Sequence, residues 1–183
     1  MRDGVVVAER VVVDARRHGE LLAVGLQEVL LAGDPDVVVV GVGPGPFTGL
    51  RVGIMTAAAF GDARGIEVRG VCSLDGLGAP STAVVTDARR KEVYWAVYDG
   101  SGARIDGPHV SSPEVCREAT MGLRVVGDGA QLYGFATEAE PRYPSLVGLA
   151  AAGLRGEALP LTPLYLRRPD ATEPSAAKKV TPA

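Results

Sequence analysis

A glycine- and proline-rich turn is the part of the sequence best suited to hold a phosphate group. It runs from Gly41 to Gly53, between a run of valines and a segment with helical spacing. Free N–H groups at the start of the following helix could face an anion. The turn has no dinucleotide fingerprint, because Pro46 occupies the third glycine position, and no Walker A lysine follows Gly49. The alternative, which local physics favours, is that the glycines only let the helix pack close to the sheet.

Residues that could bind a metal or act as nucleophiles are few and scattered. His18 and His109 lie far apart, and neither has a second ligand at helical spacing, so we expect packing or hydrogen-bonding roles. Three aspartates could form an acidic cluster, although charged residues at turns are usually solvated. Cys72 precedes a serine, but no Gly-x-Ser-x-Gly elbow surrounds them. Cys72 and Cys116 are predicted to be buried thiols rather than a disulfide. The aspartates are Asp75, Asp87 and Asp128.

Composition excludes several classes of protein. The 183 residues are 46% apolar, which is typical of a globular chain with a real core. No apolar run approaches the roughly 20 residues that a membrane span needs. Two short basic runs, at 16–17 and 89–91, could touch RNA phosphate, but the formal net charge of −3 disfavours a protein that grips nucleic acid unaided. We therefore expect a cytoplasmic protein without membrane contact.

The glycine-rich turn is placed by a strand before it and a helix after it. Residues 37–40 predict a strand buried on both faces, as in a parallel sheet. Thr48 is the predicted N-cap of a helix that runs to about residue 64, and an earlier helix is predicted from 18 to about 32. On the second helix, small residues recur every four positions and form a ridge without side chains. Because glycine within a helix costs about 1 kcal/mol against alanine, something must approach Gly53 and Gly61 closely, either the sheet or another helix.

The remaining pattern predicts short strands and two more helices. Asp3-Gly4 is a hairpin-turn signal, followed by a predicted strand from Val5 to Val13. Further strands are predicted at 66–71, 83–86, 93–98, 103–105 and 124–127, and helices at 113–119 and 146–154. A change of character at 78–81 predicts a boundary between two lobes. From residue 169 the composition predicts a disordered tail.

Four stretches of the sequence resemble the TsaB (YeaZ) family. They are Gly43–Gly53, residues 15–22, residues 87–95 and residues 163–168, and together they occur in the family's order. The resemblance implies an α/β, actin-like (ASKHA) two-lobed fold with a ribonuclease-H-like sheet in each lobe. Residues 1–80 would form the first lobe, 81–168 the second, and 169–183 the tail.

The resemblance also implies that this chain is not an enzyme. TsaB-like proteins are non-catalytic relatives of TsaD, the metal-dependent enzyme that makes threonylcarbamoyl-adenosine in tRNA. In TsaD-like proteins a comparable turn and helix lead to a His-x-x-x-His pair that binds the metal. Here Ser73 and Leu77 stand at those places, and neither replaces an imidazole as a ligand. We expect no metal and no other cofactor.

The start of the chain departs from the family's pattern. TsaB-like chains have two strands before the position of Asp3-Gly4, and only Met1 and Arg2 precede it here. We therefore expect the first lobe to lack its first two strands, and the natural protein to begin about 20 to 30 residues upstream. Because the missing hairpin carries a phosphate loop in actin-like folds, its absence also counts against ATP binding.

The sequence thus predicts a scaffold subunit that binds and activates a TsaD-like catalytic subunit. A TsaE-like ATPase would belong to the same complex, tRNA would be contacted indirectly, and the chain alone would form a homodimer. The alternative is an actin-like ATPase or metallopeptidase (glycoprotease) with its site in the cleft between the lobes. The predicted partner interface lies on the first two helices and consists of His18, Leu22, Leu26, Val29, Leu50, Gly53 and Ala57.

Overall fold

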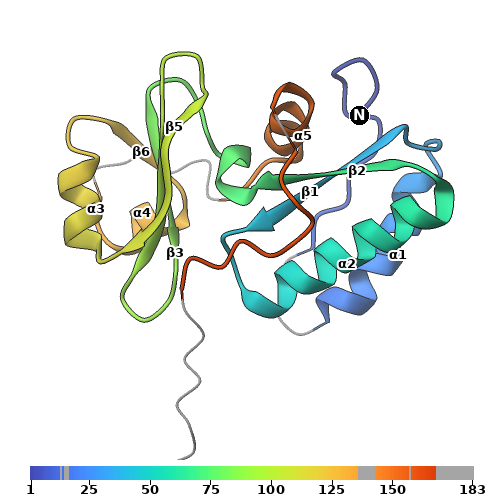
Figure 1. Ribbon diagram of the computed structural model, residues 1–183, viewed down its shortest axis with the longest axis horizontal. Helices are drawn as coiled ribbons and strands as arrows, with labels where there is room; N and C mark the ends of the chain where they lie inside the picture. Colours follow the sequence, from blue (N-terminus) through green and yellow to red (C-terminus); the bar gives the residue numbers. More distant parts are fainter. Residues whose placement is uncertain (13, 15–16, 136–142, 157, 168–183) are drawn as a thin grey trace, which may run out of the picture.

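The computed structural model describes residues 1–12, 14, 17–135, 143–156 and 158–167, and these form two sheets with helices around them (Figure 1). The first half of the chain contains α1 (His18–Leu30), β1 (Val37–Gly43), α2 (Phe47–Arg64), β2 (Glu67–Cys72) and the 3-10 helix η1 (Ser73–Gly76). The second half contains β3 (Thr82–Asp87), β4 (Val93–Tyr98), β5 (Arg104–Ser111), α3 (Pro113–Ala119), β6 (Arg124–Val126), α4 (Asp128–Leu132) and α5 (Leu146–Arg155).

The first sheet consists of β1 and β2, which pair in parallel with Val38 opposite Val68. Helices cover both of its faces. A Cβ at Gly61 of α2 would lie 2.2 Å from Val68, and a Cβ at Gly153 of α5 would lie 2.6 Å from Val39. Because side chains alternate along a strand, Val39 and Val68 point to opposite faces. Helices on both faces account for the continuous valine run of β1, although residues 37–40 are only half-buried and not fully buried as the sequence predicted.

The second sheet has the strand order β5-β4-β3-β6, in which β3 pairs antiparallel with β4 and parallel with β6. Both of its faces are packed. Val85, Val93 and Trp95 lie in one core cluster with Cys116 of α3. The other face carries a second cluster, shared with the end of the first half: Cys72, Leu74, Leu77, Val84, Ala96, Tyr98 and Val126. The second cluster therefore joins the two halves of the molecule.

Two local predictions were wrong. Asp3 and Gly4 do form the predicted turn, with φ values of 50° and 78°, but residues 6–12 form no strand. A strand needs a neighbour for its N–H and C=O groups, and this segment pairs with none among the described residues. Thr48 is not the N-cap either, since α2 begins at Phe47 with Pro46 in the cap position. The predicted tail at 169–183 lies outside the described residues.

The chain passes between the two sheets more than once. After β6 and α4, helix α5 packs against β1, β2 and η1 rather than against the second sheet. The division at residue 80 stays a prediction, and any division has to assign α5 to the first sheet. In the part of the chain that the structure describes, no helix combines the length and the apolar character needed to cross a membrane.

Candidate partner interface

The glycine-rich turn is filled by the chain itself. The N–H of Gly43 donates to Ser73 Oγ at 3.0 Å. Gly43 has a φ of +114°, and a Cβ there would lie 3.0 Å from Leu50 and 3.2 Å from the carbonyl oxygen of Leu164. Only glycine fits this position without strain. These contacts support the packing alternative over a phosphate loop.

A partly buried polar network occupies the junction of the two halves. Asp75 of η1 accepts hydrogen bonds from Tyr98 Oη at 2.8 Å and from Arg104 Nε at 2.9 Å. Burial, and next the Asp75 charge, raise the pKa of Tyr98 above its ordinary value. The same two causes raise the pKa of the Cys72 thiol to about 11. A thiol that stays protonated at neutral pH is a poor nucleophile, so Cys72 has a packing role.

Of the three candidate aspartates, the structure brings two together. Asp128 Oδ1 accepts a hydrogen bond from the N–H of Asp87 at 3.2 Å. Asp87 in turn accepts from the N–H of Arg89 at 2.8 Å and pairs with its guanidinium at 3.3 Å. No group of three or more His, Cys, Asp or Glu side chains that could hold a metal ion occurs in the described part of the chain. A hollow of about 400 Å³ lies beside the pair, lined by Asp87, Arg89, Asp128, Gln131, Leu132 and Tyr143.

Ser73 and Leu77, which stand at the positions of the metal-binding histidines of TsaD-like proteins, both have structural roles here. Ser73 holds the glycine-rich turn through its hydroxyl group. Leu77 is buried in the core cluster that joins the two halves. Ser73 and Leu77 therefore do not fit the metal site of TsaD-like proteins. His109 is also engaged, since it bonds to Asp106 at 2.7 Å and packs on the Trp95 ring with centroids 4.5 Å apart.

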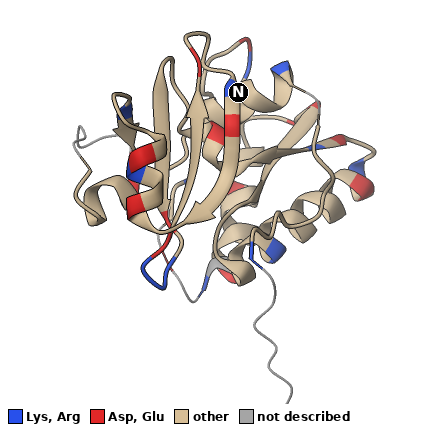
Figure 2. Ribbon diagram, turned by 60° about the vertical axis from the view of Figure 1, so that its left-hand side comes forward, with Lys and Arg blue, Asp and Glu red and all other residues tan. Residues whose placement is uncertain are grey.

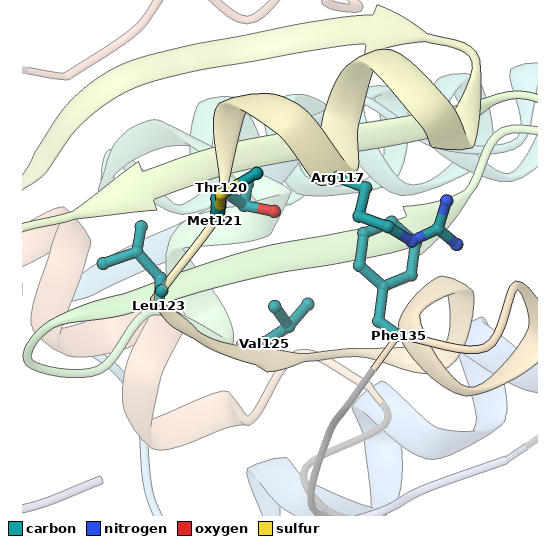
Figure 3. A pocket seen from close by; sticks show the side chains of 7 residues that line it. Arg117, Thr120, Met121, Leu123, Val125 and Phe135 are labelled. Atoms are coloured by element: carbon teal, nitrogen blue, oxygen red, sulfur yellow. The ribbon is translucent and has the colours of Figure 1, made fainter.

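A second hollow, of about 330 Å³, lies between α3 and β6 (Figure 3). Arg117 lies over the ring of Phe135, with Cζ 4.8 Å from the ring centroid, and donates to the carbonyl oxygen of Tyr133 at 3.0 Å. Val125 and Leu123 supply apolar walls. One cation among apolar groups offers no acid–base pair for catalysis.

The predicted interface residues lie on two helices that pack side by side. Leu22 on α1 is 38% exposed, and Leu26 and Val29 are half-buried. Leu50 on α2 is turned inward against Gly43 and Gly45. His18 begins α1, but its side chain lies outside the described part of the structure.

The ridge of small residues on α2 consists of Gly49, Gly53, Ala57 and Gly61, and its two ends have different surroundings. At Gly61 the approach is by β2, because an added Cβ would meet both Val68 and the carbonyl oxygen of Ile66. At Gly49 and Gly53, nothing among the described residues lies within 4 Å of an added Cβ. The ridge therefore packs on the sheet at its C-terminal end and leaves open space at its N-terminal end.

No role was predicted for residues 158–167, which we call the strap. The strap crosses from one half to the other in Figure 1, where it is the red segment below α5. Leu159 and Leu164 donate to Gly70 and Val42 of the first sheet. Tyr165 stacks on Phe47 with ring centroids 5.2 Å apart, and its hydroxyl accepts a hydrogen bond from Arg51. The resemblance of residues 163–168 to the family was a sign that this segment matters. The local sequence did not indicate which residues the segment contacts.

The strap ends on the second half of the molecule. Arg167 forms an ion pair with Glu92 and donates to the carbonyl oxygen of Arg89 at 3.2 Å. Both residues belong to the loop between β3 and β4. The strap thus connects the start of α2 to that loop.

The family model that matches this chain is TsaD, tRNA N6-adenosine threonylcarbamoyltransferase, over residues 13–155. An uncharacterised protein of Mycobacterium leprae is 50% identical over 99% of this chain and 55% of its own length. An uncharacterised protein of Mycobacterium tuberculosis is 49% identical over 92% of this chain and 84% of its own length. This chain therefore spans about half the length of the M. leprae relative.

Two solved structures from Pseudomonas aeruginosa resemble this one. A protein with similarity to peptidase YeaZ is 29% identical with a TM-score of 0.67, and the match covers 83% of this chain and 85% of that one. YeaZ itself is 26% identical with a TM-score of 0.68, over 81% and 86% of the two chains. Because YeaZ has the actin-like α/β fold, the predicted fold class is confirmed. The chain belongs to the TsaD family, described as tRNA N6-adenosine threonylcarbamoyltransferase, and within that family it is a protein of the YeaZ (TsaB) type.

Proposed function

We propose that this chain is a non-catalytic subunit that binds and activates a TsaD-like catalytic subunit for threonylcarbamoyl transfer to adenosine in tRNA. One observation carries the proposal: Ser73 and Leu77 replace the metal-binding histidine pair, and both are committed to packing. Replacing either residue with a metal-binding histidine would disrupt the turn or the core. The chain therefore depends on a partner for the chemistry of its family.

The face of α1 and α2 is the proposed place for that partner. This helix pair carries large apolar side chains that its own fold leaves exposed, and clustered exposed apolar groups mark association sites. They are Leu22 and Val24 on α1, Leu31 directly after it, and Met55 on α2. Without the partner, the same face would pair with a second copy about a two-fold axis. A TsaE-like ATPase would join the assembled complex.

Capture of the TsaD-like subunit from the same genome tests the interface. Gly53→Arg adds a long cation where an added Cβ meets nothing within 4 Å, and arginine favours a helix more than glycine does. We expect the variant to fold normally and to lose the partner in a binding titration. The matched control is Ala119→Arg, at an exposed position at the end of α3 in the other half. Unchanged capture by Gly53→Arg would show that this face is not the interface.

Reconstitution tests the catalytic part of the proposal. We expect no modification of tRNA by this chain alone, and faster modification by the TsaD-like subunit when this chain is added. Transfer of the threonylcarbamoyl group by the purified chain alone would refute a non-catalytic role. Metal analysis adds a second readout, since one ion per chain that is lost on mutating His18 would also refute it.

A further inference from the structure

We propose that this chain itself contacts single-stranded RNA, through a surface beside the start of α2. The proposal rests on the proposed function for its substrate class, but it replaces the indirect contact with tRNA that the sequence predicted. We call this the aromatic–basic surface, and it consists of Phe47, Arg51, Arg89, Arg90, Lys91 and Tyr165.

Its aromatic part is two stacked rings that face solvent. Phe47 is 54% exposed and Tyr165 is 43% exposed, and their planes are 16° apart. Arg51 lies with Cζ 4.0 Å from the Phe47 centroid and donates from Nε to the Tyr165 hydroxyl at 2.8 Å. Exposed rings with an adjoining guanidinium are the groups on which unpaired bases stack.

Its basic part is the loop between β3 and β4, whose backbone is unusual. Arg89, Arg90 and Lys91 have φ values of 62°, 56° and 61°, three left-handed residues in succession without a glycine. A Cβ disfavours this conformation at each position. The loop is closed by the N–H of Ala88, which donates to the carbonyl oxygen of Glu92 at 3.0 Å. The sheet thus holds a strained turn that presents three adjacent cationic side chains to solvent.

The strap places the two parts side by side. Arg167, two residues after Tyr165, donates to the carbonyl oxygen of Arg89. Figure 2 shows the blue tip of the loop at the lower edge of the molecule. The nearby carboxylates of Asp87 and Glu92 are already paired with arginines. Among the described residues Arg51 and Lys91 have no carboxylate within ion-pair distance, so their charges remain available for phosphates.

An RNA strand fits this surface better than a protein does. Cations next to open rings match a phosphate backbone with unpaired bases, whereas the apolar helix pair matches a protein partner. Arg51 and Gly53 lie on the same helix but, being two residues apart, they point to different sides of it. RNA and a catalytic subunit can therefore bind at the same time.

Fluorescence anisotropy with labelled RNA tests the inference on the isolated chain and on its complex. The probes are a hairpin with an unpaired loop and a fully paired duplex of equal length. We expect the hairpin to bind more tightly, because paired bases cannot stack on side chains. Tyr165→Leu should weaken hairpin binding about fivefold or more. Lys91→Gln should make the slope of log K against the logarithm of the salt concentration shallower by about 0.7. This is the value expected for one lost phosphate contact on a single strand.

Arg155→Gln is the matched control, because Arg155 is an exposed cation on α5 whose Nε donates to the carbonyl oxygen of Ala151 in the same helix. Circular dichroism melts verify that each variant is folded. Equal affinity for hairpin and duplex, or no change in either variant, overturns the inference. If the variants lose capture of the catalytic subunit but keep RNA binding, the surface binds protein and the inference is again overturned. The proposed function is tested separately, since Gly53→Arg should lose the partner while the isolated variant still binds RNA.

Discussion

The two sheets use similar valine-rich strands but bury them to different degrees. In the second sheet, Val84, Val85 and Val93 are fully buried. In the first sheet, residues 37–40 are only half-buried, although their sequence is the most apolar run in the chain. The difference lies in the neighbours, because four paired strands with a core cluster on each face exclude water better than two. The first sheet therefore leaves part of its apolar strand surface accessible, whereas the second sheet excludes water from its central strands.

The largest expected effect comes from the core of the second sheet. Trp95 is 6% exposed and its indole N–H donates to Ser111 at 2.9 Å. Trp95→Ala should lower the free energy of unfolding by about 3–5 kcal/mol, since it leaves a large cavity. Urea denaturation measures the change. Val38→Ala in the first sheet should cost less, and an equal cost would contradict the contrast between the sheets.

A smaller loss is expected where the first half is tightly packed. Gly61→Ala places a Cβ 2.2 Å from Val68 and 2.8 Å from the carbonyl oxygen of Ile66. Because the helix and the strand must move apart, we expect a destabilisation of about 1–3 kcal/mol despite the better helix propensity of alanine. Thermal unfolding followed by circular dichroism tests this. A rise in melting temperature would show that α2 and β2 are not in firm contact.

The junction of the halves should respond to alkaline pH. The ordinary pKa of a cysteine here is 9.0, and burial followed by the Asp75 charge raises the pKa of Cys72 to about 11. A raised pKa contributes stability that is fully present below pH 9 and is lost as the pH rises through about 11. The wild type should therefore lose stability across this range more steeply than Cys72→Ala. Parallel slopes in pH-dependent urea titrations would show that Cys72 is not held neutral in the folded state.

The smallest effect has the opposite sign. At Gly53 nothing among the described residues lies within 4 Å of an added Cβ. Gly53→Ala should stabilise the chain by about 0.5–1 kcal/mol, because alanine loses less backbone entropy in a helix. Differential scanning calorimetry beside Gly61→Ala makes the comparison direct. If both substitutions destabilise equally, the ridge is packed along its whole length.

Elements with a local pattern were predicted well from the sequence. The alternation of residues 93–98 predicted β4 to the residue, and the apolar spacing after residue 18 predicted α1 within two residues of its end. Short elements were harder. α4 was missed because five residues carry too little periodicity to be told from a turn. The strand predicted at 5–13 failed because its composition was right but its pairing partner was absent among the described residues.

For the candidate site too, the chemical type of each residue could be read from the sequence, but its contacts could not. Ser73 and Leu77 could be recognised in the sequence as unfit for a metal, because ligand chemistry depends on residue type. Their actual roles depend on contacts with Gly43 and with the joining core cluster, across 30 residues in the case of Ser73. Asp75 was grouped with Asp87 and Asp128 by type alone, and the structure places it in a different network with Tyr98 and Arg104.

The sequence by itself determined most of the helices and strands, the glycine-rich turn and, through the family resemblance, the missing histidine pair, since each depends on residues close together in the chain. Only the tertiary structure decided which glycines of α2 are covered. It also decided that the strap connects Phe47 and Arg51 to the loop at Arg89, a contact that spans 114 residues between Arg51 and Tyr165. The physical reason is that periodicity records which face of an element is apolar, whereas the group that covers that face comes from distant parts of the chain.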